Sequence, residues 1–97
     1  GEPTMNEQEI GKYLEELSSG WKWEKNPDKI TKEFKFKDFE EALSFTNAVG
    51  EIAEKEGHHP NIYIHSYNKV KIELWSHKIG GLHENDFILA AKIEELN

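Results

Sequence analysis

The apolar residues of the chain recur at helical spacing in three segments, which predicts three amphipathic helices. The first two open with capping signals at Asn6 and Asp38, and Gly20 and Gly57 are expected to end them. The third follows a pair of glycines. The stripes expected to face the core are Ile10, Tyr13, Leu14 and Leu17; then Phe39, Ala42, Leu43, Thr46, Val49 and Ala53; and finally Leu89, Ala90, Ile93 and Leu96, with Asp86 at the head of the last stripe.

Between these helices the apolar residues alternate with polar ones, which predicts strands. Trp21 and Trp23 alternate with charged residues before a turn at 26–28, and the strand after that turn is interrupted by Lys32. A second hairpin is expected to turn at 68–69. The apolar positions of the last three strands are Ile30, Phe34 and Phe36; Ile62 and Ile64; and Val70, Ile72 and Leu74.

The order of these elements, α-β-β-α-β-β-α, predicts an α+β fold. Two hairpins separated by a helix favour a four-stranded antiparallel sheet with the three helices on one face. The other face of the sheet, or one of its edges, would remain exposed, and this arrangement favours self-association into a dimer.

Length and charge limit the kind of protein this can be. With 97 residues the chain forms one domain, expected to span 6–97 after a flexible N-terminus or expression remnant at 1–5. Its net charge of -7 disfavours direct nucleic-acid binding, and the lack of cysteine excludes disulfides and thiolate metal sites. No apolar run approaches the roughly 18 residues of a membrane span. A cytoplasmic location is therefore expected.

The residues with unusual chemistry lie mostly between Glu54 and Asp86. His58 and His59 stand at a helix-to-strand junction, His77 follows the fourth strand, and Asp86 opens the last helix. Short hairpins can bring these places together into one cleft. Imidazole both gives and takes protons near neutral pH, so such a cleft suits an elimination in which one group protonates a leaving hydroxyl and another accepts a proton.

Structural roles are the alternatives for the same residues. A histidine pair in a loop is often solvated, Asp86 could simply favour a helix N-terminus, and Glu54 could belong to a solvated helix face. A zinc site is a sharper competitor, but His58 and His59 are adjacent and point to opposite sides in an extended chain, which disfavours a shared ion. Four further residues are expected to have no role in the site: Trp75 and Tyr67 as packing residues, and His65 and His83 as surface residues.

Several of these segments together resemble the signature of a known family. They are Glu54-Lys55-Glu56-Gly57-His58-His59-Pro60, Tyr67-Asn68-Lys69-Val70, Ser76-His77, Gly81-Leu82 and Asp86. Their spacing is similar to that of the pterin-4a-carbinolamine dehydratases, and weaker likeness extends over nearly the whole chain. The resemblance implies a four-stranded sheet with three helices on one side, and assembly as homodimers or homotetramers. It also implies a cofactor-free enzyme that converts a 4a-hydroxy-tetrahydropterin to the quinonoid dihydropterin.

The resemblance also assigns roles by position. His58, His59 and His77 would be catalytic, and supporting or substrate-binding roles would fall to Glu54, Pro60, Ser76 and Asp86. No metal ligand is implied. The sequence departs from the family pattern at three positions: Ser76 replaces the usual Thr, His83 the helix-start Ser or Thr, and Asn85 a basic residue.

Two other functions are compatible with the same pattern. Animal members of this family also serve as a dimerisation partner of a transcription factor, so a non-catalytic binding module is one alternative. Other relatives are associated with molybdopterin metabolism or with assembly of a photosynthetic carboxylase, which is the second.

Overall fold

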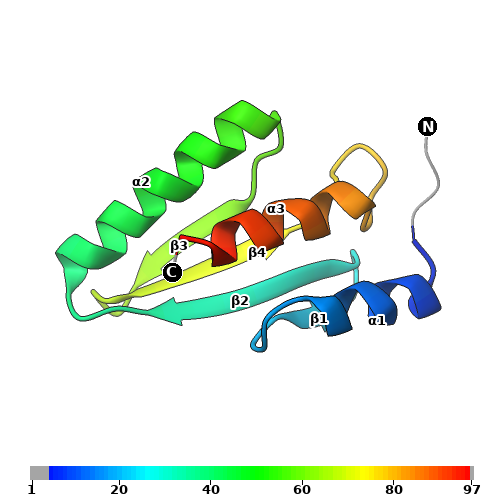
Figure 1. Cartoon of the computed structure of the whole chain (residues 1–97), viewed down its shortest axis with the longest axis horizontal. Helices are drawn as coiled ribbons and strands as arrows, with labels where there is room; N and C mark the ends of the chain where they lie inside the picture. The colour runs from blue at the N-terminus through cyan, green and yellow to red at the C-terminus, as the bar shows by residue number, and fades with distance from the viewer. Residues whose placement is uncertain (1–4, 97) are drawn as a thin grey trace.

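The computed structural model describes residues 5–96, and Figure 1 shows how its helices and strands are arranged. The elements are α1 (Glu7–Glu16), β1 (Lys22–Glu24), β2 (Lys29–Lys35), α2 (Phe39–Glu56), β3 (Asn61–His65), β4 (Lys69–Leu74) and α3 (Glu84–Glu94). This order and the antiparallel four-stranded sheet confirm the predicted α+β class.

The four strands form one sheet in the order β1-β2-β4-β3, in which all neighbours run antiparallel. The register places Ile30 opposite Leu74, and Ile72 opposite both Lys32 and Ile62. Because side chains alternate between the two faces of a strand, these residues share one face and their neighbours share the other. The second face is rich in charged and polar side chains: Lys22, Glu24, Lys29, Thr31, Glu33, Lys35, Asn61, Tyr63, His65, Lys69, Lys71 and Glu73.

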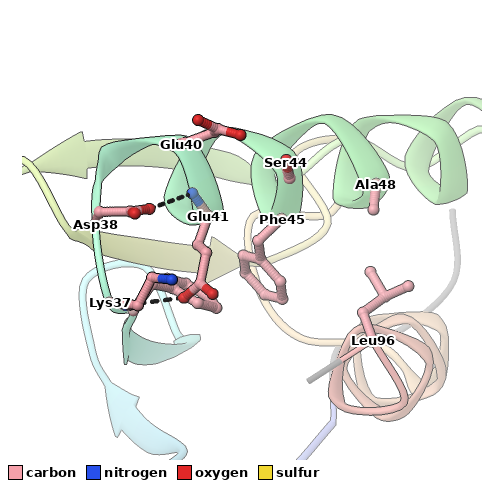
Figure 2. Close-up of a pocket in the computed structure, with 9 residues that line it drawn as sticks. Lys37, Asp38, Glu40, Glu41, Ser44, Phe45, Ala48 and Leu96 are labelled. Atoms are coloured by element: carbon pink, nitrogen blue, oxygen red, sulfur yellow. Dashed lines mark hydrogen bonds between the residues drawn. The ribbon is translucent and has the colours of Figure 1, made fainter.

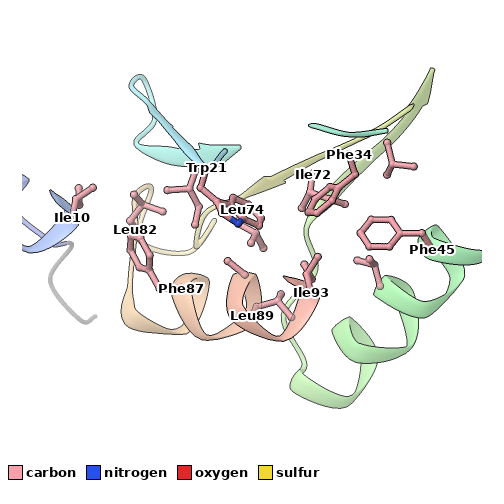
Figure 3. Packing of buried hydrophobic residues seen from close by; sticks show 14 of the residues in the cluster. Ile10, Trp21, Phe34, Phe45, Ile72, Leu74, Leu82, Phe87, Leu89 and Ile93 are labelled. Carbon is pink, nitrogen blue, oxygen red and sulfur yellow. The ribbon is translucent and has the colours of Figure 1, made fainter. Parts of the chain in front are cut away.

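All three helices contribute to a single core on the apolar face of the sheet, as Figure 3 shows. Helices α2 and α3 pack against each other, and α2 also contacts β3 and β4. Helix α1 joins the core through buried Ile10 and through Tyr13, whose ring stacks on Phe87 of α3 with centroids 5.2 Å apart. The expected placement of the helices is confirmed.

The predicted stripe of α2 is only partly correct. Ala42, Val49 and Ala53 are buried, but Phe39 and Leu43 are 50% and 41% exposed. Phe45, which the expected stripe omitted, is buried instead and packs against Phe34 and Phe36. The face of α2 that packs on the sheet is therefore rotated about the helix axis, relative to the face that the apolar periodicity predicted.

Helix α3 shows a similar difference at its end. Leu89, Ala90 and Ile93 are buried as expected, whereas Leu96 lies past the helix and is exposed. Phe87 is buried although it was not among the expected core residues.

The end of α1 also differs from the expectation. The helix stops at its C-cap residue Leu17, three positions before Gly20. Gly20 has a φ of 103°, so it serves the turn that leads into β1 instead. Lys32, which interrupts the apolar face of β2, reaches the rim of the core and donates hydrogen bonds to Glu94 and to the carbonyl of Ser19.

The hairpin between β3 and β4 turns earlier than predicted. Ser66 and Tyr67 have positive φ values of 50° and 53° and make the turn. Asn68 is buried; its backbone carbonyl accepts the N–H of Phe36, and its side-chain amide donates to the Phe36 carbonyl. A contact with a distant strand end therefore overrides the usual preference of asparagine for the turn itself.

Two smaller observations complete the fold. Of the expected N-terminal tail, residues 1–4 lie outside the described residues, while Met5 donates its backbone N–H to the carbonyl of Leu82 at 3.1 Å. Among residues 5–96 there is no helix with the length and hydrophobicity needed to cross a membrane.

Candidate active site

Three histidines from two separate segments line one hollow of the surface. The hollow has a volume of about 470 Å³ and lies where the end of α2 meets the loop that follows β4. Its lining residues are Gly57, His58, His59, Ser76, His77 and Lys78. The structure thus brings together the three histidines that the sequence analysis selected. Gly57 and Lys78 had not been selected for this lining.

The end of α2 presents the histidine pair. Gly57 caps the helix in the left-handed conformation, with a φ of 64°, and the backbone N–H of His58 donates to the carbonyl of Ala53 at 3.2 Å. A side chain at position 57 would be strained in this conformation. Pro60 follows directly before β3 and fixes its own φ. The short junction is therefore held by the helix cap on one side and the strand on the other.

Asp86 lies behind His58, completely buried, and each of its oxygens is occupied. His58 Nε2 contacts Asp86 Oδ1 at 2.5 Å, while Oδ2 accepts hydrogen bonds from Ser76 Oγ at 3.0 Å and from the N–H of His83 at 2.9 Å. When Asp86 is ionised it can only accept, so Nε2 of His58 carries a proton and Nδ1 is left for another partner.

His83 takes part in this arrangement, contrary to its expected role as a surface residue. It is the N-cap of α3: its Nδ1 accepts the N–H of Asn85 at 3.3 Å, and its own N–H is bound by Asp86. Histidine thus replaces the usual serine or threonine cap, and Asp86, three residues later, closes the capping box. The carboxylate of Asp86 therefore caps the start of α3 and holds His58 of the candidate site at the same time.

The second histidine has a more exposed partner. His59 Nε2 contacts Glu54 Oε2 at 2.5 Å, and the two side chains are 63% and 78% exposed. By contrast, the side chain of His58 is only 21% exposed. Solvent screens the His59–Glu54 contact strongly, so it fixes its imidazole less firmly than Asp86 fixes that of His58.

The loop after β4 carries His77. The backbone N–H of Ser76 donates to the carbonyl of Gly81 at 2.8 Å, and the N–H of Gly80 returns to the carbonyl of Ser76 at 3.0 Å. These bonds close the loop at its base. The His77 ring stacks on Trp75, with centroids 4.2 Å apart and ring planes 11° from parallel.

Two aromatic residues were expected only to pack. Trp75 is partly buried against the core as expected, and its contact with His77 is additional. Tyr67 is 64% exposed at the hairpin turn, so the packing role predicted for it is wrong. His65, on the charged face of the sheet, pairs with Glu33 and lies apart from the hollow.

A second, larger hollow of about 620 Å³ has different chemistry. It lies between the first half of α2 and Leu96, and Figure 2 shows Phe45 and Leu96 facing it from opposite sides. Its carboxylates are partly engaged in the local backbone, since Asp38 accepts the N–H of Glu41 and Glu41 accepts the N–H of Lys37. No histidine lines it. Acid–base chemistry near neutral pH therefore points to the smaller hollow.

A metal centre has no geometric support in residues 5–96. No group of three or more His, Cys, Asp or Glu side chains is arranged there to hold a metal ion. Both carboxylates nearest the histidines, Asp86 and Glu54, are engaged by an imidazole.

Comparison with known proteins identifies the family. The model for Pterin 4 alpha carbinolamine dehydratase matches residues 3–96. The chain belongs to the pterin-4-alpha-carbinolamine dehydratase family. A relative from Alkaliphilus metalliredigens, provisionally given this dehydratase name, is 50% identical over 95 residues, which cover 98% of this chain and 84% of the relative. The chain is accordingly a dehydratase of this family, a hydro-lyase that acts on a pterin.

Two solved structures of dehydratase relatives share the fold. One, described as a transcriptional coactivator/pterin dehydratase from Brucella melitensis, has a TM-score of 0.88 at 34% identity and covers 96% of this chain and 97% of that one. The other is a pterin dehydratase-like protein described as a RuBisCO assembly factor in the alpha-carboxysome. It has a TM-score of 0.68 at 26% identity and covers 79% of this chain and 88% of that one.

Proposed function

We propose that this dehydratase uses His58, His59 and His77 to remove water from a 4a-hydroxy-tetrahydropterin. The product is the quinonoid dihydropterin, and the reaction serves the recycling of tetrahydropterin after aromatic amino-acid hydroxylation. The observation that carries the proposal is the gathering of three imidazoles around one hollow, two of them backed by carboxylates at 2.5 Å.

The reaction needs one proton donor and one proton acceptor. A carbinolamine carries a hydroxyl group and a nitrogen on the same carbon, here C4a. The C4a–O bond breaks, the hydroxyl takes up a proton and leaves as water, and the neighbouring nitrogen loses its proton as its electron pair forms a C=N bond. General acid–base assistance of this kind accelerates a reaction by about 10²- to 10⁴-fold.

His58 suits the role of proton acceptor. Its Nε2–H is held by buried Asp86, which leaves the lone pair of Nδ1 to take the proton from the substrate nitrogen. The same carboxylate then stabilises the imidazolium that forms. Asp86 is itself fixed by Ser76 and by the backbone of His83, so the imidazole keeps its orientation during the transfer.

His77 suits the role of proton donor, and His59 that of a binding residue. Neither ring nitrogen of His77 is hydrogen-bonded to another of residues 5–96, so both are available to the leaving hydroxyl. His59 is the more exposed member of the pair and is held by Glu54 at the rim, where it can contact the pterin. Pro60 supports both histidines by stiffening the junction.

The test uses three histidine variants in a stopped-flow dehydration assay. His58→Gln and His77→Gln should each lower kcat about 10²-fold while the protein stays folded by circular dichroism. His65→Gln is the matched control, because His65 also pairs with a glutamate but lies outside the hollow. It should keep kcat within about twofold of the wild type. Full activity in both hollow variants would contradict the proposal.

A second candidate is a protein-binding module. The relatives described as a transcriptional coactivator and as a RuBisCO assembly factor favour it, and exposed Phe39 and Leu43 on α2 offer an apolar surface. An affinity purification that returns a stoichiometric protein partner, lost in the variant Leu43→Lys, would support this role. Retention of the same partner by Leu43→Lys would place the contact elsewhere.

A further inference from the structure

Trp75 lies between His77 of the hollow and Lys29 on the charged face of the sheet, which is called the outer face below. It follows β4 directly, is partly buried against the core, and stacks on His77 with ring planes 11° from parallel. A centroid separation of 4.2 Å is full aromatic contact, so the indole covers one face of the imidazole. The His77 side chain is otherwise exposed and has no hydrogen bond to another of residues 5–96.

The indole is anchored in turn by charged residues of the outer face. Lys29 Nζ lies 5.5 Å from the centre of the Trp75 ring, within range of a cation–π contact. The same ammonium lies 3.4 Å from Glu73 Oε2 and 3.8 Å from Glu24 Oε1, which hold it in place. Lys29 of β2 therefore links the Trp75 ring to the carboxylates of Glu24 and Glu73, which lie on the strands at either side, β1 and β4.

Glu73 is the buried carboxylate that holds Lys29 in place. It is buried although it lies on the outer face, and its Oε1 accepts hydrogen bonds from Asn61 and Tyr63. Burial alone would raise the pKa of Glu73, but the hydrogen bond from Asn61 and the charges of Lys29 and Lys71 hold the pKa below its ordinary value. The carboxylate therefore stays charged at neutral pH and keeps Lys29 beside the indole.

We propose that Trp75 is a positioning residue for the dehydration, one that fixes the ring plane of His77 against the hollow. An exposed histidine at a loop would sample several rotamers, and a displacement of about 1 Å in a catalytic group can reduce the rate about 10²-fold. The stack leaves His77 little freedom to rotate without breaking aromatic contact. This inference rests on the proposed catalytic role of His77.

The first test is spectroscopic and does not depend on activity. The carbon-bound ring protons of His77, assigned by comparison with His77→Gln, should resonate upfield of the other histidines because they lie over an indole. Trp75→Phe should reduce this ring-current shift, and Trp75→Leu should abolish it. An unchanged His77 shift in Trp75→Leu would show that the stack does not exist in solution and would overturn the inference.

The second test is kinetic. Trp75→Leu should lower kcat about tenfold with KM within about twofold of the wild type, and Trp75→Phe should recover most of kcat because a flat ring is restored. Trp23→Leu is the matched control: Trp23 is also partly buried against the core, but its Nε1 donates to Asp28 at 3.0 Å and it does not touch His77. Its kcat should equal that of the wild type.

The outcomes separate the two claims. Wild-type kcat in a folded Trp75→Leu protein would overturn the positioning role while leaving His77 catalysis intact. If Trp75→Leu does not fold, Trp75→Phe takes its place in the spectroscopic test, and a His77 ring-current shift as large as that of the wild type in this variant would overturn the inference. A wild-type enzyme that fails to accelerate dehydration would overturn the proposed function, even where the stack is seen.

Discussion

At the scale of single residues, Asp86 is the point where the hydrogen bonds of the candidate site converge. The buried carboxylate binds His58, Ser76 and the backbone of His83, so it serves the imidazole, the loop after β4 and the start of α3 together. Removing its charge should therefore affect both stability and chemistry.

We expect Asp86→Asn to lower the free energy of unfolding by about 1–3 kcal/mol, because an amide cannot accept all the hydrogen bonds made by the carboxylate and leaves buried groups unsatisfied. Urea denaturation measures this loss. Nitrogen-15 NMR should also show that His58 no longer holds its proton on Nε2 alone, a change that a purely structural role would not produce. An unchanged tautomer would contradict the positioning role of Asp86.

Glu54 provides a comparison with Asp86, since it also contacts an imidazole at 2.5 Å but is exposed. Exposed ion pairs contribute about 0–1 kcal/mol. Glu54→Gln should therefore leave the urea midpoint close to that of the wild type. A loss as large as that of Asp86→Asn would show that the His59–Glu54 contact is much stronger than its exposure implies.

The sequence could predict which residues lie in the candidate site, but not the hydrogen bonds and ring contacts between them. The inward position of Asp86 followed from the apolar stripe of its helix, and the histidines were selected by chemistry and by family resemblance. The contact from His58 to Asp86 joins residues 28 positions apart, and the ring of His77 lies on Trp75. Such contacts depend on how loops fold back on the sheet, which periodicity does not describe.

At the scale of elements, the end of α2 positions two of the three histidines. Gly57 has a φ of 64°, and a Cβ there would meet nothing within 4 Å, so only backbone strain opposes a substitution. Gly57→Ala should lower the free energy of unfolding by about 1 kcal/mol. Gly50→Ala is the control, because Gly50 lies inside the same helix with equally open space. It should raise stability by about 0.4–1 kcal/mol. Equal effects of both substitutions in urea denaturation would contradict this account of the cap.

The charged face of the sheet should contribute stability that depends on pH. The pKa of Glu73 is held below 4.5 in the folded protein, so its contribution is fully present above the unfolded pKa and is lost as pH falls through the folded pKa. The difference in unfolding free energy between the wild type and Glu73→Gln should therefore be constant near neutral pH and shrink below pH 4.5. Urea denaturation between pH 3 and pH 7 tests this, and a difference independent of pH would contradict it.

Element types and caps could be predicted because they depend on local sequence. The capping box at Asn6, the N-cap at Asp38 and the helix stop at Gly57 are of this kind. The rotation of α2 was not predictable in the same way, since Phe39 and Phe45 are both apolar and lie on different sides of the helix. The choice of the buried side depends on how Phe45 fits against Phe34 of β2 and against Phe36, which follows that strand.

At the scale of the whole molecule, both edges of the sheet and part of α2 remain open in residues 5–96 of the single chain. Edge strands β1 and β3 each have one unpaired side, and Phe39 and Leu43 are exposed on α2. The homodimer or homotetramer expected from the sequence stays a prediction, as does the cytoplasmic location. Light scattering after size-exclusion chromatography should give the mass of two or four chains. Elution as a single chain across the micromolar range would show that the prediction is wrong.

The central claim is that the hollow formed by His58, His59 and His77 carries out the dehydration. Its most direct test is a stopped-flow measurement on freshly generated 4a-hydroxy-tetrahydropterin, with the wild type beside the double variant His58→Ala/His77→Ala. We predict that the wild type accelerates loss of water, and that the folded double variant matches the uncatalysed rate. A double variant that keeps the wild-type acceleration would contradict the claim and move the active site elsewhere on the molecule.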